Sequence, residues 1–297
     1  MIGFGLIGGS IARALAEAPD RAAWTVVAWS PSGHGPARAA ADGIVAAASQ
    51  PEAALEGAEL VLIAAPPRAT LDRLDWLARA VGSTLDPGAV LTDVASTKGA
   101  IVARATELGL RFVGGHPMAG RETTGYAAAV ADLFRDRPWV VVPTDPDDVG
   151  AVLAVETLAA ACGGRPVRIG AVAHDAAVAA VSHLPLVLAA ALVEAVAGGS
   201  DGRAAPHDWP LARDLAAGGW RDMTRLARGD IAMGAGIAAT NAPELARRIR
   251  AVRKVLDGWL AELERPGGPD ERALADRLRV ARAHLESPAE LPAEPPA

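Results

Sequence analysis

A histidine on a loop rich in glycine and proline is the side chain of this sequence best suited to acid–base chemistry. His116 lies between Gly115 and Pro117, which restrict the backbone on both sides, and it follows an apolar run, 110–113, typical of a strand end. An imidazole titrates near neutral pH and can accept or donate a proton. Glu122, further along the loop, is placed to tune its charge or to close the site. The segment predicts proton transfer on a small molecule.

A second polar segment follows the preceding predicted strand, 89–94. Asp93 lies near the end of that strand, and Ser96 and Lys98 come soon after it. Because ligands of open α/β sheets bind at the carboxyl ends of the strands, Ser96 is a candidate donor to a substrate hydroxyl or to a nicotinamide. A helix cap at Ser96 with a solvated Lys98 explains the same residues equally well.

Two more histidines occur in a later apolar segment, 173–197. His174 and Asp175 open it, and Asp175 is expected to cap the N-terminus of this helix. His183 lies among apolar residues beside Pro185 and needs a polar partner. It is either a core histidine with a satisfied ring or a residue that faces the substrate cleft.

Two arginines lie close together in a short segment that begins with glycine, 218–225. The guanidinium groups of Arg221 and Arg225 suit bidentate recognition of a carboxylate. Asp222 can pair with one of them at the surface, so we expect a single arginine to bind substrate.

The chain opens with a glycine pattern typical of dinucleotide binding. Gly3, Gly5 and Gly8 match G-x-G-x-x-G, with Leu6 and Ile7 between the last two, and a helical stretch follows. In this pattern the first glycine allows a tight turn, the second lets the pyrophosphate approach the backbone, and the third permits close helix packing. A strand should precede the loop, so we expect that the first strand is truncated and that the true start lies upstream.

The residues after the second predicted strand leave the choice of nicotinamide cofactor open. The acidic residue that commonly holds the ribose 2′-hydroxyl is missing there. Ser30, Ser32, His34 and Arg38 could bind a 2′-phosphate, but a solvated turn that tolerates either cofactor explains them as well. NAD and NADP are both retained as candidates.

Composition excludes several classes of function. A formal net charge of −6 over 297 residues gives no basic surface for nucleic acid. The single cysteine, Cys162, excludes an internal disulfide and a cysteine zinc cluster, and we expect no metal. No secretory signal is visible, so we expect a cytoplasmic protein. The apolar run 178–197 is interrupted by polar residues and lacks flanking charges, which favours a buried core or interface helix over a membrane span.

The order of apolar runs predicts an α/β domain followed by an all-helical domain. Strands are expected at 24–29, 60–65, 89–94, 111–113, 139–142 and 166–169, with helices between them at 36–42, 51–57, 68–80 and 98–108. This alternation predicts a doubly wound parallel sheet with helices on both faces. Only helices are expected later, at 173–197, 208–229, 231–240 and 242–263. The expected domains are 1–170 and 171–264, with a linker, a short helix and a disordered tail over 265–297.

In this order and spacing, the motifs resemble those of the prephenate/arogenate dehydrogenase family of tyrosine biosynthesis. The resemblance covers about residues 1–263 and rests on the segments 3–10, 93–99, 115–120, 174–175, 182–185 and 221–225. It implies a Rossmann-type domain followed by an all-helical dimerisation domain, hence a homodimer, with the active site between the domains. The implied reaction is NAD(P)-dependent oxidative decarboxylation of prephenate to 4-hydroxyphenylpyruvate, or of arogenate to tyrosine.

The resemblance also implies a role for each candidate residue. His116 would bond the C4 hydroxyl of the substrate and accept its proton as hydride leaves C4, and Ser96 would share that hydroxyl and orient His116. Arg225 would hold a substrate carboxylate. His183 and Glu122 would line the cleft.

Two other interpretations compete with this one. A hydroxyacid- or imine-type dehydrogenase also pairs a Rossmann domain with a helical one, but it usually relies on a lysine or aspartate of the second domain, where this chain offers arginine and histidine. A dinucleotide-binding protein without turnover is favoured only by the short first strand and by Leu186, which stands where the family often has a second histidine. The joint presence of Ser96, His116 and Arg225 argues against it. The choice between prephenate and arogenate, and control by tyrosine, are left open.

Overall fold

The computed structural model describes residues 1–121, 123–198 and 207–286. Glu122 and the predicted disordered end, 287–297, lie outside the described residues. The chain divides into two compact units, Met1–Leu245 and Ala246–Ala297. Each unit is described by itself below.

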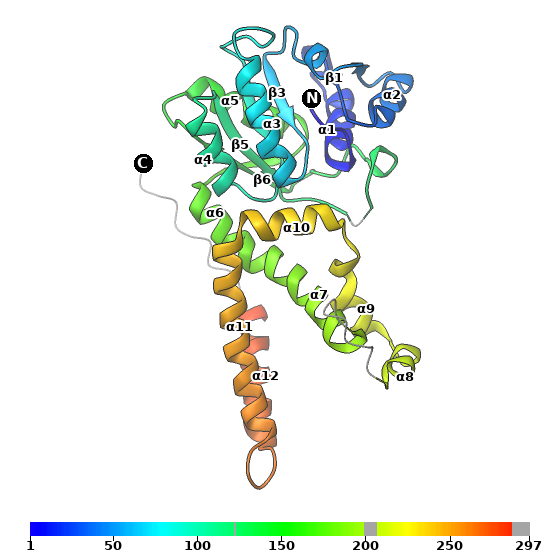
Figure 1. The fold of residues 1–297 in the computed structure, drawn as a ribbon, viewed down its shortest axis with the longest axis vertical. Helices are drawn as coiled ribbons and strands as arrows, with labels where there is room; N and C mark the ends of the chain where they lie inside the picture. The colour runs from blue at the N-terminus through cyan, green and yellow to red at the C-terminus, as the bar shows by residue number, and fades with distance from the viewer. Residues whose placement is uncertain (122, 199–206, 287–297) are drawn as a thin grey trace. The chain divides into compact units, whose positions relative to one another are not determined.

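A mostly parallel sheet forms the centre of the first unit (Figure 1). Its strands are β1 (Val27–Ala28), β2 (Ala46–Ala47), β3 (Leu60–Ile63), β4 (Val90–Asp93), β5 (Phe112–Pro117), β6 (Pro138–Pro143) and β7 (Arg165–Arg168). Five of them pair in the order β3-β4-β5-β6-β7, and β1 pairs with β2. Ile2 bridges Trp29 and Ile63 in parallel, so the first residues of the chain lie between the two groups of strands. The predicted α/β fold is confirmed.

One pairing in this sheet is antiparallel, which the sequence pattern did not predict. β5 and β6 run in opposite directions, with His116 opposite Val140. Parallel neighbours require a long crossover connection, usually a helix. Within the described residues, the segment between these two strands contains only the 3₁₀ turn η3 (Tyr126–Ala128), so β6 returns alongside β5 in the opposite direction.

Helices cover both faces of the sheet. They are α1 (Leu6–Glu17), α2 (His34–Ala41), α3 (Pro67–Ala80), α4 (Gly99–Glu107) and α5 (Val149–Ala161). Along β3, Val61 and Ile63 pack into one core with residues of α3 and α4, while Leu62 packs into a second core with residues of α1 and α5. Successive strand residues point to opposite faces, so this alternation buries both sides of the sheet.

The remaining elements of the first unit are helical. They are α6 (Ala171–Val178), the π turn η4 (Ala179–His183), α7 (Leu184–Ala197), α8 (Trp209–Asp214), α9 (Gly218–Thr224), η5 (Arg225–Arg228) and α10 (Ile231–Thr240). Pro185 at the start of α7 has no N–H, and its ring would clash with a regular preceding turn, which accounts for the π turn.

The helix formed by α6, η4 and α7 is the one described helix long and apolar enough to cross a membrane, with a mean hydropathy of 2.2 over its most apolar window. Core helices of soluble proteins pass the same test, but only 22% of this window is buried within the chain. Val172 is 81% exposed and Val181 is 73% exposed. One chain alone therefore leaves much of this apolar surface uncovered, contrary to a buried core helix and in keeping with an interface helix.

The second unit is a helical hairpin. Helix α11 (Ala242–Leu263) begins in the first unit and continues into the second, and α12 (Glu271–Glu286) follows. Gly267 and Gly268, with φ of 92° and 97°, form the turn between the helices. The Arg277 guanidinium lies 5.1 Å from the centre of the Trp259 ring, which joins α12 to α11.

Candidate active site

The candidate site forms where β4 and β5 end next to one another. The carboxylate of Asp93 accepts hydrogen bonds from the backbone N–H of Ala95 at 2.9 Å and of Gly115 at 3.1 Å. Its third partner is the ammonium of Lys98, and both of these side chains are fully buried. Lys98 is therefore not solvated, contrary to the alternative that the sequence allowed. The carboxylate of Asp93 therefore joins the loop after β4, which carries Ser96 (the Ser96 loop), to β5, which carries His116.

The glycines before His116 make room for this ion pair. A Cβ atom on Gly115 would meet the backbone oxygen of Asp93 at 2.4 Å, and one on Gly114 would meet Cδ of Lys98 at 3.0 Å. Burial lowers the pKa of Lys98, and the charges of Asp93 and Asp175 counteract this. The two glycines and His116 thus lie within β5, not on the loop expected from the sequence, and the glycines serve close packing.

His116 is buried and bonded to a second histidine. Its Nδ1 lies 2.9 Å from Nε2 of His174, and Nδ1 of His174 lies 2.8 Å from Oδ1 of Asp175. Burial lowers the pKa of His116 well below its usual range, and the neighbouring His174, Lys98 and His183 lower it further. The imidazole is thus neutral near pH 7, which is the form that a general base requires.

Asp175 caps a helix, but a different one from that expected. It lies inside α6, and its carboxylate oxygens accept the backbone N–H groups of Lys98 and Gly99, each at 2.8 Å, at the N-terminus of α4. A Cβ atom on Gly99 would meet Oδ2 of Asp175 at 2.8 Å, so the close approach requires glycine. The predicted cap at the start of its own helix is wrong, because α6 begins at Ala171, and the alternative of a cap at Ser96 is wrong as well, because α4 begins at Gly99.

His183 is the third histidine of the cluster. Its ring is buried, and its Nδ1 lies 3.1 Å from Nδ2 of Asn241, which also donates to the backbone oxygen of Asp175 at 2.8 Å. Burial lowers the pKa of His183 to about 4, although Asp175 and the backbone of Ser96 raise it somewhat. Nε2 of His183 is enclosed and makes no hydrogen bond within the described part of the chain.

The structure brings some of the predicted site residues together and leaves others as predictions. His116, His183 and the Ser96 loop lie in one cluster, but the Ser96 hydroxyl is not hydrogen-bonded to His116 among the described contacts. Arg225 is exposed and begins η5, which packs against α7. Glu122 lies outside the described residues.

Sequence reasoning missed three contributors to this cluster. Asn241 is the single residue between two predicted helices, which suggests a helix end but says nothing of a bond to His183. The sequence pattern assigns no role to His174 and does not predict the pairing of Asp93 with Lys98. The contacts of Asn241 and of His174 with His116 join segments far apart in the chain, which no local pattern reveals, whereas Asp93 and Lys98 are only five residues apart and their pairing depends on their burial.

The glycine loop has the geometry that a dinucleotide requires. Gly3 has a φ of 92°, and a Cβ atom there would meet the backbone oxygen of Ala64 at 2.3 Å, so this turn requires glycine. A Cβ atom on Gly8 would lie 3.0 Å from the Gly3 oxygen, in keeping with close helix packing. Gly5, in contrast, has open space where its Cβ would be, so a ligand can approach its backbone.

The N-terminus of α1 is also suited to an anion. No side chain caps it, and its first turn carries no acidic residue. The free backbone N–H groups and the helix dipole there favour a pyrophosphate. These residues therefore fit a nicotinamide dinucleotide, with Leu6 and Ile7 in the first turn.

The residues proposed for the 2′ position differ in accessibility. Ser32 and Arg38 are exposed after β1, as a contact with the ribose or a 2′-phosphate requires. Ser30 is buried, and its hydroxyl oxygen is enclosed and without a hydrogen-bond partner among the described residues. His34 is exposed as well, so Ser30 is the weakest of the four candidates.

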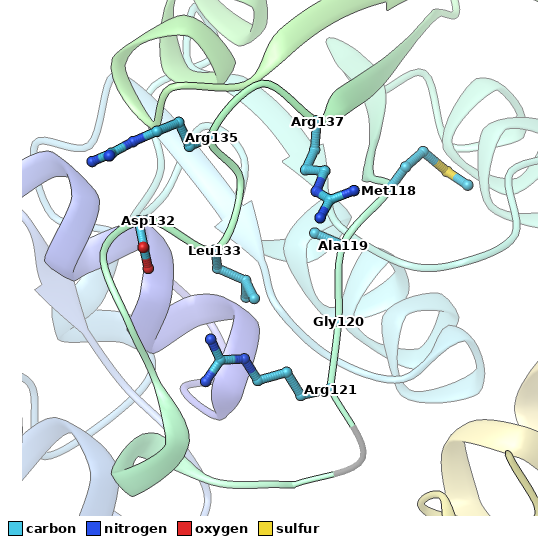
Figure 2. Close-up of a pocket in the computed structure, with 8 residues that line it drawn as sticks. All are labelled: Met118, Ala119, Gly120, Arg121, Asp132, Leu133, Arg135 and Arg137. Atoms are coloured by element: carbon cyan, nitrogen blue, oxygen red, sulfur yellow. The ribbon is translucent and has the colours of Figure 1, made fainter. Parts of the chain in front are cut away.

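A polar pocket of about 480 Å³ lies on the loop that follows His116 (Figure 2). It is lined by Met118, Ala119, Gly120, Arg121, Asp132, Leu133, Arg135 and Arg137. The guanidinium groups of its arginines point in different directions in Figure 2 and do not converge on one point. We therefore place the chemistry at the histidine cluster, where the buried titratable groups contact one another.

Comparisons with known proteins agree with this arrangement. A family model described as prephenate dehydrogenase, nucleotide-binding domain, matches residues 12–168, and one described as prephenate dehydrogenase, dimerization domain, matches residues 171–270. The prephenate dehydrogenase of Bacillus subtilis (strain 168) is 30% identical over 269 residues, which span 89% of this chain and 68% of that protein.

Solved structures are similar over almost the whole chain. Synechocystis arogenate dehydrogenase has a TM-score of 0.74 at 30% identity, covering 96% of this chain and 98% of that one. Prephenate dehydrogenase from A. aeolicus, in complex with hydroxyphenyl propionate and NAD+, has a TM-score of 0.79 at 25% identity, covering 96% of each chain. With both domain models matched in order, the chain belongs to the prephenate dehydrogenase family of oxidoreductases.

Proposed function

We propose that this chain catalyses the NAD(P)-dependent oxidative decarboxylation of prephenate to 4-hydroxyphenylpyruvate. The observation that carries the proposal is a buried, neutral His116 at the same sheet edge as a glycine loop with dinucleotide geometry. A base and a hydride acceptor at one edge are what oxidation of an alcohol carbon requires. Ser96, in the loop beside His116, is the second candidate to contact the substrate hydroxyl.

The chain itself handles a proton and orients the substrate. As hydride leaves C4 of the ring, the hydroxyl proton on C4 moves to Nε2 of His116, and the bond between C1 and the ring carboxylate breaks to release CO2. The ring becomes aromatic, and the proton returns from His116 to the phenolate oxygen, so atoms and charge balance. The bound nicotinamide supplies the hydride acceptor. Arg225 is proposed to hold a substrate carboxylate, and His183 and Glu122 to line the cleft.

The alternative substrate is arogenate, which would give tyrosine directly. A specific observation favours keeping it: one of the similar solved structures is an arogenate dehydrogenase at 30% identity. The two substrates differ in a keto or an amino group on the side chain, away from the ring carbon that His116 serves. Either substrate is compatible with the chemistry at His116.

The proposal is tested by nicotinamide reduction with purified full-length protein. Prephenate and arogenate are each paired with NAD and with NADP, and the His116→Ala variant is the control for the catalytic base. Turnover with prephenate that is lost in the variant supports the proposal, and turnover with arogenate alone identifies the alternative substrate. Reduction with neither substrate in any pairing contradicts it.

The cofactor is proposed to be NAD or NADP, bound by Gly3, Gly5, Leu6, Ile7 and Gly8, with Ser32 and Arg38 near the ribose. The Arg38→Ala variant separates the two. If NADP is preferred because Arg38 binds the 2′-phosphate, the variant raises the KM for NADP and leaves that for NAD unchanged. An equal KM change for both cofactors contradicts a phosphate contact.

We also propose that the protein is a cytoplasmic homodimer joined through the apolar helix of α6, η4 and α7. The exposed valines of this helix and the match to a dimerisation-domain model support it. Burial of such a face against a second copy removes apolar surface from water. Light scattering after gel filtration without detergent tests this directly, because a monomer or a protein that needs detergent would contradict it.

A further inference from the structure

A chain of hydrogen bonds runs behind His116 and ends at the N-terminus of a helix. Nδ1 of His116 meets Nε2 of His174 at 2.9 Å, and Nδ1 of His174 meets Oδ1 of Asp175 at 2.8 Å. The two carboxylate oxygens of Asp175 also accept the backbone N–H groups of Lys98 and Gly99. All three side chains are at least nine-tenths buried, so water does not replace these bonds.

The direction of each bond follows from the chemistry of Asp175. Hydrogen bonds from His174 and from two backbone N–H groups outweigh the effect of burial and lower the pKa of Asp175, so its carboxylate is ionised and only accepts. Nδ1 of His174 must therefore carry the proton that it donates. An imidazole that carries only this proton has its lone pair on Nε2, where it accepts from Nδ1–H of His116. The lone pair of neutral His116 is left on Nε2.

The backbone of Asp175 determines the tautomer of a second histidine, His183, and this tautomer is the opposite of that in His116. The Asp175 carbonyl only accepts, so the side-chain atom of Asn241 that faces it at 2.8 Å is the amide nitrogen. The second N–H of that nitrogen faces Nδ1 of His183 at 3.1 Å, which must accept it. Neutral His183 therefore carries its proton on Nε2.

We propose that Asp175, acting through His174 and Asn241, is the positioning residue that gives the two histidines opposite tautomers, an acceptor at Nε2 of His116 and a donor at Nε2 of His183. The effect of Asp175 on catalysis rests on the proposed function, whereas the tautomers of the two histidines do not depend on turnover. His116 is thereby prepared to accept the substrate proton. His183, whose Nε2 is enclosed and whose pKa the Ser96 backbone raises, lies beside the loop that carries Ser96.

The arrangement has a further electrostatic consequence. When His116 takes up a proton, its Nδ1–H stays bonded to His174, and the negative charge of Asp175 lies at the end of that chain. Burial and the positive Lys98 both oppose a charge on His116, so Asp175 offsets part of their effect. Removing the negative charge should therefore slow proton uptake and leave substrate binding largely unchanged.

The tautomers are measured directly by nitrogen-15 NMR of the histidine rings in the ligand-free full-length protein near pH 7. The chain has six histidines, so His116→Gln, His174→Gln and His183→Gln variants assign the ring signals. The expected pattern is a protonated Nδ1 on His116 and on His174 and a protonated Nε2 on His183. A protonated Nε2 on neutral His116, or a protonated Nδ1 on His183, overturns the proposal.

Kinetics of Asp175→Asn test the catalytic consequence. Since a wrong tautomer withdraws the base, kcat should fall on the order of 10²-fold or more with little change in KM. His174→Leu should have a similar effect, and His174→Gln should restore part of kcat because its side-chain oxygen can accept from His116. Equal losses in the leucine and glutamine variants would contradict a hydrogen-bonding role for His174.

The matched control is Asp148→Asn. Asp148 also caps a helix, α5, by accepting the N–H of Ala151 at 3.0 Å, and it pairs with Arg111, the residue just before β5, which carries His116 near its other end. The control should lose stability through the weakened helix cap and keep its kcat. If it loses kcat as Asp175→Asn does, the effect of Asp175 is structural and the proposal is wrong.

The two proposals fail in different ways. The expected ring pattern together with no turnover on either substrate contradicts the proposed function and leaves the tautomers in place. Turnover together with the opposite ring pattern contradicts the role of Asp175 alone.

Discussion

At the scale of single residues, the site depends on a few buried polar side chains that satisfy one another. Asp93 and Lys98 form an ion pair with no exposure to solvent, and His116 lies against a second histidine. Burial of such groups is costly unless each has a partner. The same burial that imposes this cost keeps His116 neutral, which is its working form.

The pH dependence of the reaction should follow from the lowered pKa of His116. A base must be neutral, and a pKa well below 6.5 keeps it neutral as pH falls through the usual histidine range. We expect kcat/KM for the preferred substrate to hold steady from neutral pH to below about 6.5 and to decline only at lower pH. A rate profile over a pH series checks this, and a decline centred at or above the usual histidine value would contradict it.

The ion pair of Asp93 and Lys98 should be costly to break from one side. Lys98→Met removes the cation and leaves the Asp93 carboxylate buried without it, so the free energy of unfolding should fall by about 3–5 kcal/mol. Urea unfolding measures the loss. Lys254→Met, at the chain's other lysine, which is exposed, is the matched control and should change stability little. Similar losses in both variants would show that Lys98 is not held as described.

At the scale of elements, the fold brings loops from different strands to one sheet edge. The glycine loop follows Ile2, the Ser96 loop follows β4, and His116 lies in β5. A helix of the second half of the chain then completes α4 through Asp175. The site is therefore assembled from both halves of the first unit.

The glycine loop yields a prediction at this scale. A methyl group on Gly5 would meet nothing within 4 Å in the protein, so Gly5→Ala should fold with little change in melting temperature. It would, however, stand where a pyrophosphate approaches the backbone, and we expect the KM for the nicotinamide cofactor to rise roughly tenfold or more. Cofactor titration and thermal unfolding measure the two effects.

Gly234→Ala is the control for this substitution. Gly234 lies in α10, where an added Cβ is 3.6 Å from Leu186, an ordinary contact. We expect unchanged or slightly raised stability and an unchanged cofactor KM. A cofactor KM that is also unchanged in Gly5→Ala would contradict the placement of the dinucleotide.

Much of the fold followed from local sequence patterns. The helices predicted at 231–240 and 242–263 match α10 and α11, and the strand runs were found because apolar residues cluster there. The sequence pattern does not predict the antiparallel direction of β6. That direction depends on the lack of a crossover helix in the described part of the segment between β5 and β6. Asp175 was recognised as a cap but assigned to the wrong helix, since its partner lies 77 residues earlier in the chain.

At the scale of the whole molecule, the chain leaves an apolar helix uncovered. The run of α6, η4 and α7 is long and apolar enough for a membrane span, yet it follows directly on the α/β part of the chain, which has its own buried cores. The dimerisation-domain match covers this helix. We propose that a second copy of the chain covers this apolar helix.

A charge placed on this helix should separate the proposed dimer. Val181 is 73% exposed in the π turn, and Val181→Asp would bury a carboxylate in the interface, so we expect a monomer by light scattering at concentrations where the parent protein is a dimer. Leu153→Asp on α5, which is 51% exposed in the α/β part, is the matched control and should stay dimeric. A dimeric Val181→Asp would show that the interface lies elsewhere.

The cap that Asp175 provides for α4 also constrains how such proteins can be recombined. The two family models meet between residues 168 and 171, which is a natural junction for exchanging halves between relatives. A chimera joined there takes Gly99 from one parent and the aspartate from the other, although α4 needs both. Whether a hybrid folds and turns over should thus depend more on whether the donor half supplies a His-Asp pair at this place than on its overall identity.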